Sequence, residues 1–299
     1  MPAARRLRIV HLFSDVLRFY GDGGNVGTLV SRAEARSIAT SVTHVPIGAS
    51  RLPPADLVLI GGGQDREQVT VALELERLGN QLTEMVAAGT ALLAVCGGYQ
   101  NLGTSYCTAL GVDLPCPGLL PVSTDATGRG RRLVGPVLAQ VHRELTALGR
   151  PSPSGAADDR DEPPSRRTVV GFENHGGRTV LEAGARPFAT IEIGNGNNDL
   201  DDTEGVLLLP GEGGLRGLRL GTYLHGPLLP RNPHIADALI AAAIGHGDVT
   251  VGLAPLDDRL DWAAHDAAAD RLRAEDRAER RIPGWAHRVV DPIAALIGY

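Results

Sequence analysis

The 299-residue chain contains no lysine, because all 29 of its basic residues are arginine. A Walker A phosphate loop, a kinase-type phosphate-binding lysine and a Schiff-base nucleophile each require a lysine, so the sequence excludes all three. If the reaction of this protein consumes ATP with Mg²⁺, we expect another chain to bind them. A codon bias toward arginine, alanine and glycine is a compatible cause of the same absence.

Cysteine is scarce as well, and the three present, Cys96, Cys107 and Cys116, show no C-x-x-C spacing. An odd number without that spacing argues against a disulfide framework and a thiolate zinc site, so we expect no metal. No apolar run approaches the roughly 18 residues that span a bilayer, and the first residues lack the apolar stretch of a signal peptide. We therefore expect a cytoplasmic protein.

Charge of one sign is not concentrated anywhere along the chain. The formal net charge is −6 and the arginines are scattered, which argues against a nucleic-acid partner and against a polybasic membrane patch. Hydrophobic residues make up 43% and charged residues 21% of the chain, close to the averages of globular proteins. The length fits one α/β domain of about 200 to 250 residues with additional segments.

Short apolar runs that end in glycine alternate with helical patterns, which predicts an α/β fold with a mostly parallel, open sheet and flanking helices. The expected strands are residues 7–13, 42–47, 57–60, 91–95, 169–172, 205–209 and 218–224. The expected helices are residues 26–39, 67–88, 98–104, 233–244 and 260–281.

The domain organisation follows from two changes in composition. Residues 1–245 form the expected catalytic domain, interrupted at residues 151–167 by a Pro-, Ser- and charge-rich segment that we interpret as a mobile loop insertion. Residues 246–299 form an expected helical C-terminal extension, charged on most faces of its helix. This extension is either a docking element or a solvated helix packed along one narrow stripe.

The segment ALLAVCGGYQNLG places an apolar strand directly before Cys96, followed by two glycines and the start of a helix. This pattern predicts a nucleophile elbow at the carboxyl edge of the sheet, where a helix N-terminus favours the thiolate. A buried structural cysteine is the alternative. The three glycines of GGGQD (61–65), after another strand, offer amide groups that can converge on an anion.

A proton shuttle for this cysteine is expected on the same sheet edge. His225 follows the apolar run 218–224 and meets that condition, whereas His175 in GFENHGGRT is the competing candidate among the nine histidines.

Six motifs together resemble a known family. They are YGDGGN (20–25), GGGQD (61–65), VCGGYQNLG (95–103), GFENHGGRT (171–179), GNGNND (194–199) and GTYLHGPLLPRNP (221–233). The set is similar to the class I glutamine amidotransferases of the cobyric acid synthase type, and most closely to the glutaminase subunits of lipid II isoglutaminyl synthases. The resemblance covers about residues 7–245, without the loop insertion or the C-terminal extension.

The resemblance implies an enzyme that hydrolyses L-glutamine and passes ammonia to a Mur-ligase-like partner of the MurT type, in a heterodimer. That partner would use ATP to amidate the D-glutamate of lipid II, which would bring this cytoplasmic chain to the inner face of the membrane. Cys96 would form the glutamyl thioester, with His225 as general acid and base and the amides of Gly62 and Gly97 as the oxyanion hole. We expect Arg132 to bind glutamine, with Arg131 as the alternative.

Gln100, at the start of the helix after Cys96, completes the expected glutamine-binding residues. The sequence departs from the family at Ala94, where many members have glycine, and at Pro227, two residues after the histidine, where the triad carboxylate is usual. The resemblance implies that the partner supplies this acid. In-chain candidates for it are Glu173, Asp199 and Glu204.

Three other functions remain open from the sequence. The first is the amidotransferase part of a corrin-ring amide synthase, which normally has an ATP-binding domain upstream in the same chain, whereas here the pattern begins at residue 7. The second is a catalytically silent binding module, which Pro227 favours and the intact Cys96 and His225 oppose. The third is a thiol peptidase or PfpI-like hydrolase, which would show no preference for glutamine.

Overall fold

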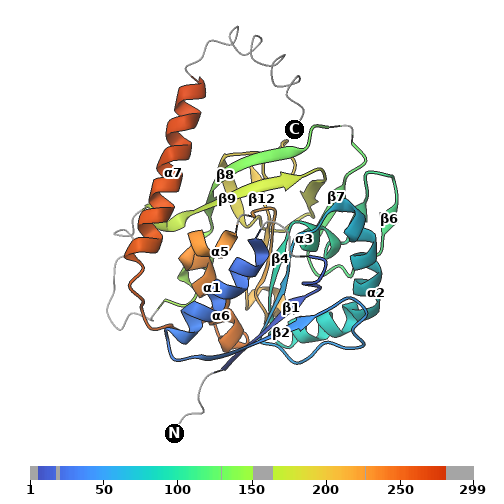
Figure 1. Ribbon diagram of the computed structural model, residues 1–299, viewed down its shortest axis with the longest axis horizontal. Coiled ribbons are helices and arrows are strands. Elements are labelled where there is room, and N and C mark those ends of the chain that lie inside the picture. Colours follow the sequence, from blue (N-terminus) through green and yellow to red (C-terminus); the bar gives the residue numbers. More distant parts are fainter. Residues whose placement is uncertain (1–5, 18–20, 129, 151–163, 226, 281–299) are drawn as a thin grey trace.

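The computed structural model of the protein describes residues 6–17, 21–128, 130–150, 164–225 and 227–280. A six-stranded sheet forms its centre (Figure 1), in the order β13 (Val206–Leu208), β14 (Arg219–Thr222), β4 (Ala91–Val95), β3 (Leu57–Ile60), β1 (Arg6–Leu12) and β2 (Ala39–Val45). All neighbouring strands in it are parallel except the antiparallel pair β13 and β14. The predicted α/β fold with a mostly parallel sheet is therefore confirmed.

Helices cover both faces of this sheet, which explains why every residue of β3 and β4 is buried and apolar. In Figure 1, α1 (Asp22–Glu34) and α6 (Pro233–Gly245) lie on one side, and α2 (Asp65–Ala87) and α3 (Gly97–Asn101) lie on the other. Strand β2 lies at one edge of the sheet and is largely exposed.

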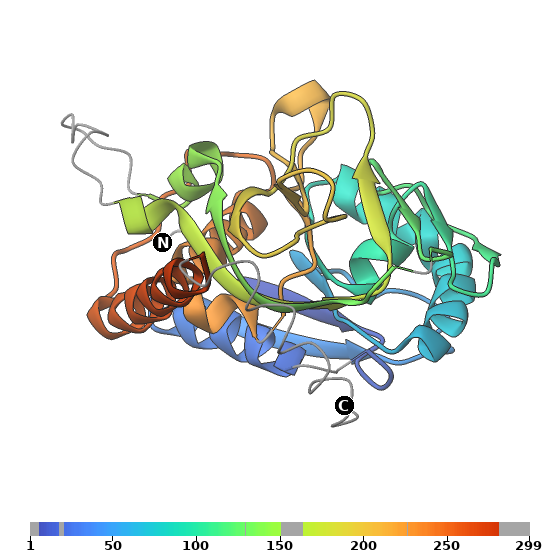
Figure 2. The same ribbon diagram turned by 90° about the horizontal axis from the view of Figure 1, so that it is seen from above.

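Two smaller sheets lie beside the central one. The first has the order β10 (Arg178–Leu181), β7 (Val122–Asp125), β5 (Ser105–Cys107) and β6 (Asp113–Leu114), and the second has the order β12 (Thr203–Glu204), β11 (Ala189–Ile193), β8 (Leu133–Val141) and β9 (Thr168–His175). Of these eight strands the sequence predicted only β9. Figure 2 shows β8 and β9 running together as a long curved pair across the molecule.

Hydrogen bonds join β9 to the end of the central sheet. The amide of His225 donates to the carbonyl of Phe172 at 2.8 Å, and the amide of Phe172 donates back to the carbonyl of His225 at 3.3 Å. Because His225 follows β14, the second sheet meets the central sheet at the carboxyl ends of its parallel strands. The candidate site lies at this junction.

The C-terminal extension contributes a long helix, α7 (Arg259–Arg280), close to the predicted 260–281. Figure 1 shows it standing at the side of the domain. Its buried residues form one narrow stripe along the helix: Trp262, His265, Ala269 and Leu272. Ala269 and Leu272 cluster with Leu138 of β8 and Val170 of β9. In the described part of the chain, no helix is both long and apolar enough to cross a membrane.

Other boundaries differ from the predicted ones. Helix α1 begins at Asp22 rather than residue 26, so it includes the buried polar residues Asp22 and Asn25. It ends at Glu34 rather than residue 39, and Ser37, just beyond its end, has a left-handed φ of 57°. Residues 151–163 of the predicted loop insertion and residues 281–299 of the extension lie outside the described residues. Short helical segments occur at α4 (Arg143–Ala147), η3 (Pro164–Arg167), η4 (Glu212–Gly214) and α5 (Leu228–Arg231).

Candidate active site

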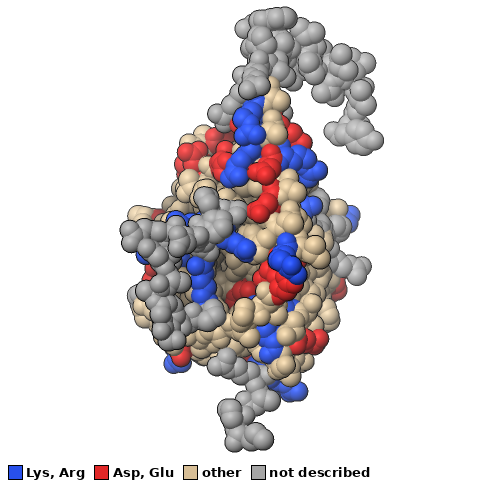
Figure 3. All heavy atoms as spheres, turned by 90° about the vertical axis from the view of Figure 1, so that its left-hand side faces the viewer, with Lys and Arg blue, Asp and Glu red and all other residues tan. Residues whose placement is uncertain are grey.

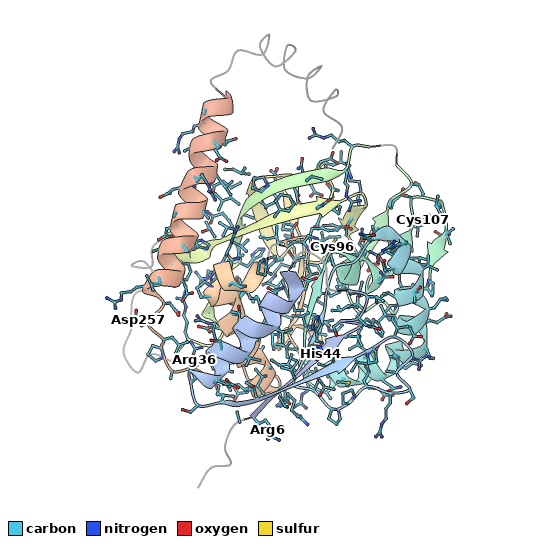
Figure 4. All side chains as sticks on the ribbon, in the orientation of Figure 1. Arg6, Arg36, His44, Cys96, Cys107 and Asp257 are labelled. Carbon is cyan, nitrogen blue, oxygen red and sulfur yellow. The ribbon has the colours of Figure 1, made fainter. Side chains whose placement is uncertain are left out.

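Cys96 occupies the sharp turn between β4 and α3, as the sequence predicted. Its φ of 48° and ψ of −103° are unusual for a residue with a side chain. Two hydrogen bonds hold the turn: the Cys96 amide donates to the carbonyl of Thr222 at 2.8 Å, and the Gly98 amide donates to the carbonyl of Gly61 at 3.1 Å. A Cβ on Gly98 would lie 2.8 Å from the carbonyl oxygen of Ile60, so only glycine fits there. In Figure 4, Cys96 lies inside the molecule, whereas Cys107 lies at its periphery.

Gly62 brings the predicted nucleophile and the predicted proton shuttle together. A Cβ built on Gly62 would lie 3.3 Å from the Cβ of Cys96 and 2.7 Å from the Cε1 of His225. Both side chains are buried, with 5% and 1% of their residues' surface exposed. Cys96 and His225 therefore flank the same glycine, which has no side chain to separate them.

A cavity of about 50 Å³ adjoins Cys96 and contains the residues predicted to bind substrate. It is lined by Gly63, Gln68, Cys96, Gln100, Tyr106, Thr108, Ala109, Ala126, Arg132, His175, Gly176 and Gly177. These residues come from α2, α3, the small sheets and the loops that follow β3 and β4. Cys96, Gln100 and Arg132, which lie up to 36 positions apart in the sequence, thus share one cavity.

Arg132 and Arg131 face different surroundings, although they are neighbours in the chain. The Arg132 guanidinium donates from Nε to Oδ1 of Asn174 at 2.6 Å and from Nη2 to the Asn174 carbonyl at 3.2 Å, which holds it at the cavity. Arg131 does not line the cavity, and its carbonyl accepts a hydrogen bond from Arg178. The geometry favours Arg132 over Arg131 as the residue that meets a substrate carboxylate.

We expect Arg132→Met to raise the KM for glutamine by about 10- to 100-fold with little change in kcat. A charged hydrogen bond to the α-carboxylate of glutamine contributes about 1.5–3 kcal/mol and is made equally in the ground and transition states. Steady-state glutamate release measures both constants. Arg131→Met is the matched control and should keep the KM within about twofold, since its side chain lies outside the cavity; an equal rise in both variants would contradict the assignment.

His175, the competing histidine, has a different environment from His225. Its ring stacks on Tyr223 with 3.5 Å between centroids, and its Nδ1 donates to the carbonyl of Gly177 at 2.9 Å. The Tyr223 hydroxyl accepts from Nε2 of Gln100 at 3.1 Å. His175 thus belongs to a packed wall of the cavity that also orients Gln100.

The three in-chain candidates for the triad acid are each engaged elsewhere. Glu173 is fully buried and accepts from the amides of Asn195 and Gly196, both at 2.9 Å, so it organises the GNGNND segment. Asp199 pairs with Arg178 at 2.8 Å at the surface. Glu204 accepts from the hydroxyl of Thr222 at 2.6 Å, and burial raises its pKa to about 7.

The electrostatic surroundings of His225 favour its neutral form. Burial, together with the nearby His175 and the guanidinium of Arg132, lowers its pKa to about 4. The imidazole is therefore uncharged at neutral pH and able to accept a proton. The imidazolium that results is disfavoured by the same surroundings.

The predicted oxyanion amides reveal two residues that the sequence did not assign. The Gly62 amide donates to Oδ2 of Asp22 at 2.7 Å, so this amide is engaged in the structure. Gly97 packs tightly against the side-chain amide of Gln68, which is buried and lines the cavity. Asp22 lies within the YGDGGN motif, but no pattern distinguished Gln68.

Among the described residues, no cluster of three or more His, Cys, Asp or Glu side chains could hold a metal ion.

The sequence of the chain matches a known protein family. The model of the CobB/CobQ-like glutamine amidotransferase domain matches residues 8–233, so the chain belongs to this family of glutamine amidotransferases.

Among the relatives, the GatD subunit of the glutamine-hydrolyzing lipid II isoglutaminyl synthase of Staphylococcus aureus is 33% identical over 91% of this chain and 98% of its own length. The corresponding GatD subunit of Streptococcus pneumoniae is 32% identical over 80% of this chain and 81% of its own length. The cobyric acid synthase of Sphingopyxis alaskensis is 29% identical over 77% of this chain but only 39% of its own length. Within the family, the chain therefore groups with the GatD subunits.

Proposed function

We propose that this chain is the glutaminase subunit of a lipid II isoglutaminyl synthase. The observation that carries the proposal is the meeting of Cys96, on its strained turn, with His225 across Gly62, beside a cavity that Arg132 and Gln100 line. The similarity to GatD subunits over nearly the full length of both chains supports the same function. The alignment with a cobyric acid synthase covers only 39% of that protein's length, so it gives weaker support to the alternative of a corrin-ring amide synthase.

In the proposed reaction, His225 takes the proton of the Cys96 thiol, and the resulting thiolate attacks the side-chain carbonyl carbon of L-glutamine and forms a C–S bond as the carbonyl oxygen takes up the negative charge. His225 gives a proton to the amide nitrogen as the C–N bond breaks, and ammonia leaves. A water molecule then loses a proton to His225 and attacks the thioester carbonyl, so that glutamate and the thiolate are released. Arg132 would bind the α-carboxylate throughout, and the amides of Gly62 and Gly97 would stabilise the tetrahedral oxyanion.

The acid that orients His225 comes, in this proposal, from a Mur-ligase-like partner. Pro227 stands where the family usually has the carboxylate, and Glu173, Asp199 and Glu204 make the other contacts described above. A carboxylate delivered beside His225 would raise its pKa and stabilise the imidazolium formed in the transition state. Ammonia would then be released chiefly when the partner, which would bind ATP and Mg²⁺, is present to use it.

We expect the partner to raise the kcat of glutamine hydrolysis by about 10-fold or more, with a smaller change in KM, because an interaction made only in the transition state lowers the barrier without strengthening substrate binding. The measurement is glutamate release by the chain alone and in complex with the ATP-dependent ligase that co-purifies with it, together with amidation of lipid II by the pair.

The same assay on Glu173→Gln, Asp199→Asn and Glu204→Gln separates the two sources of the acid. Each variant should remain responsive to the partner, with thermal unfolding used to show that it is folded. Full activity of the isolated chain that is lost on one of these changes would place the acid in this chain. Failure of the pair to amidate lipid II would exclude the proposed acceptor.

Location follows from the acceptor. Lipid II is a membrane-anchored precursor, and the proposed partner would work on its head group at the cytoplasmic face. The chain would therefore be cytoplasmic and held near the membrane through its partner.

A further inference from the structure

Asp22 is a buried carboxylate that the proposed reaction does not use. It is the first residue of α1, has no exposed surface, and accepts a hydrogen bond from the Gly62 amide at 2.7 Å through Oδ2. Its other oxygen, Oδ1, makes no hydrogen bond within the described part of the chain. Burial raises its pKa to about 7, against the opposing effect of the bond from Gly62. Burying a carboxylate with one oxygen unbonded costs free energy, so the burial of Asp22 calls for a structural or functional reason.

Helix capping does not explain Asp22. An acidic residue in the first turn of a helix usually serves the unsatisfied amides of its own helix. Here the N-cap residue is Gly21, with a φ of 90°, and no side chain makes a capping hydrogen bond. The carboxylate instead faces the loop after β3, where a Cβ on Gly61 would lie 2.5 Å from Oδ2. The contact of Asp22 is therefore with the glycine loop beside Cys96.

The bond from Gly62 to Asp22 and a bond from Gly62 to the reaction oxyanion exclude each other. A backbone amide has one hydrogen, and it cannot point at the carboxylate and at a tetrahedral intermediate on Cys96 at the same time. Loss of one oxyanion donor typically costs about 10²- to 10³-fold in kcat. An ionised Asp22 at this distance would also oppose the negative charge that develops on the substrate oxygen.

The segment that carries Asp22 also contacts the residues after His225. A Cβ on Gly24 would lie 2.9 Å from Cγ of Pro227, and Oδ1 of Asn25 accepts from the amide of Leu229 at 2.8 Å. Gly23 has open space where a Cβ would be and is exposed. The start of α1 thus touches the oxyanion loop on one side and the catalytic histidine segment on the other, with an exposed backbone between them.

We propose that Asp22 is a positioning residue that occupies the Gly62 amide in the isolated chain, and that engagement of the ligase partner moves the start of α1 and frees this amide for the oxyanion. This inference rests on the proposed function and deepens it, because it adds a second route by which the partner controls hydrolysis. Pro227 gains a role as well: it transmits displacement between the histidine segment and α1.

The test compares Asp22→Ala, Asp22→Asn and wild type, each alone and in the complex. In the isolated chain, Asp22→Ala removes the acceptor and should raise kcat for glutamine hydrolysis by about 10-fold or more without changing KM, a fraction of the usual value of one oxyanion donor. In the complex, the kcat of Asp22→Ala should equal that of wild type. The ratio of kcat with the partner to kcat without it should therefore be about 10-fold or more lower in the variant than in wild type. Asp22→Asn keeps an oxygen that can accept from Gly62 and should rise less than Asp22→Ala.

Two controls make the outcome specific. Asp15→Ala removes an exposed carboxylate that bonds the amide of Ile47 and should leave both rates unchanged. Alkylation of Cys96 by iodoacetamide needs no oxyanion amide and should change far less than hydrolysis in Asp22→Ala.

The inference is overturned if both variants are folded, the kcat of isolated Asp22→Ala stays the same or falls, and that of Asp22→Asn does not rise. Asp22 would then be a structural support for the loop. The proposed function is judged separately, by Cys96-dependent glutamine hydrolysis in the wild-type complex. If that activity is present while the Asp22 variants fail to respond, only the role of Asp22 is wrong.

Discussion

Replacing Cys96 with serine is expected to reduce glutamine hydrolysis to background, a loss of about 10⁴-fold or more. The serine hydroxyl fits the space of the thiol but does not ionise appreciably near neutral pH, and the tight turn leaves no room for the backbone to adapt. Glutamate release by the purified variant, alone and with the ligase, gives the measurement. Because one atom changes, the thermal unfolding temperature should stay close to that of wild type.

The other two cysteines are the matched controls. Cys107 lies in β5 at the periphery, where a hydrogen bond with Asp113 raises its pKa, and burial raises the pKa of Cys116 to about 11. Both thiols are therefore largely protonated at neutral pH. Cys107→Ser and Cys116→Ser should retain nearly full activity, and turnover that survives in Cys96→Ser but disappears in either control would refute the proposed nucleophile.

Replacing His225 with alanine should lower kcat by about 10²-fold or more, the usual contribution of a positioned acid or base. His225 is the histidine that shares Gly62 with Cys96, and its low pKa keeps it ready to accept a proton at neutral pH. Single-turnover and steady-state rates of glutamate release, measured with the partner present, would show the loss in the chemical step.

His175→Ala is the comparison that decides between the two histidines. Its ring packs on Tyr223 and its Nδ1 is bound to the Gly177 carbonyl, so its removal should loosen the cavity wall near Gln100. We expect a rise in KM and a smaller loss of kcat than for His225→Ala. The reverse order of kcat losses would show that GFENHGG carries the catalytic base.

The sequence predicted the inner strands β3 and β4 of the central sheet well because they are buried on both faces. Strands β3 and β4 are unbroken apolar runs, and their predicted and observed limits coincide. Strand β8 was missed because Gly135 and Pro136 interrupt its pattern. Pro136 is tolerated there because this part of β8 pairs only with β9, while β11 pairs from Leu138 onward, so the missing amide hydrogen faces no neighbouring strand.

Part of the candidate site could also be predicted from the sequence, and part could not. The proximity of Cys96 and His225 could be predicted because each directly follows an apolar run of the sequence, and parallel strands bring their carboxyl ends to one edge. The engagement of the Gly62 amide by Asp22 could not be, because it joins residues 40 positions apart through one hydrogen bond. Gln68 lacked any signal, since a glutamine in the first turns of an amphipathic helix is ordinary until its burial against Gly97 is known.

The backbone of Cys96 also bears on the choice between an enzyme and a catalytically silent binding module. A non-glycine residue at a φ of 48° and a ψ of −103° costs on the order of 1–3 kcal/mol, a substantial part of the stability of an ordinary domain. Glycine at this position would relieve that strain. A chain that only had to fold and bind would be more stable with that replacement, so a cysteine in this conformation is best explained by the reactivity of its thiol. The strained turn is thus evidence against a silent descendant of an enzyme.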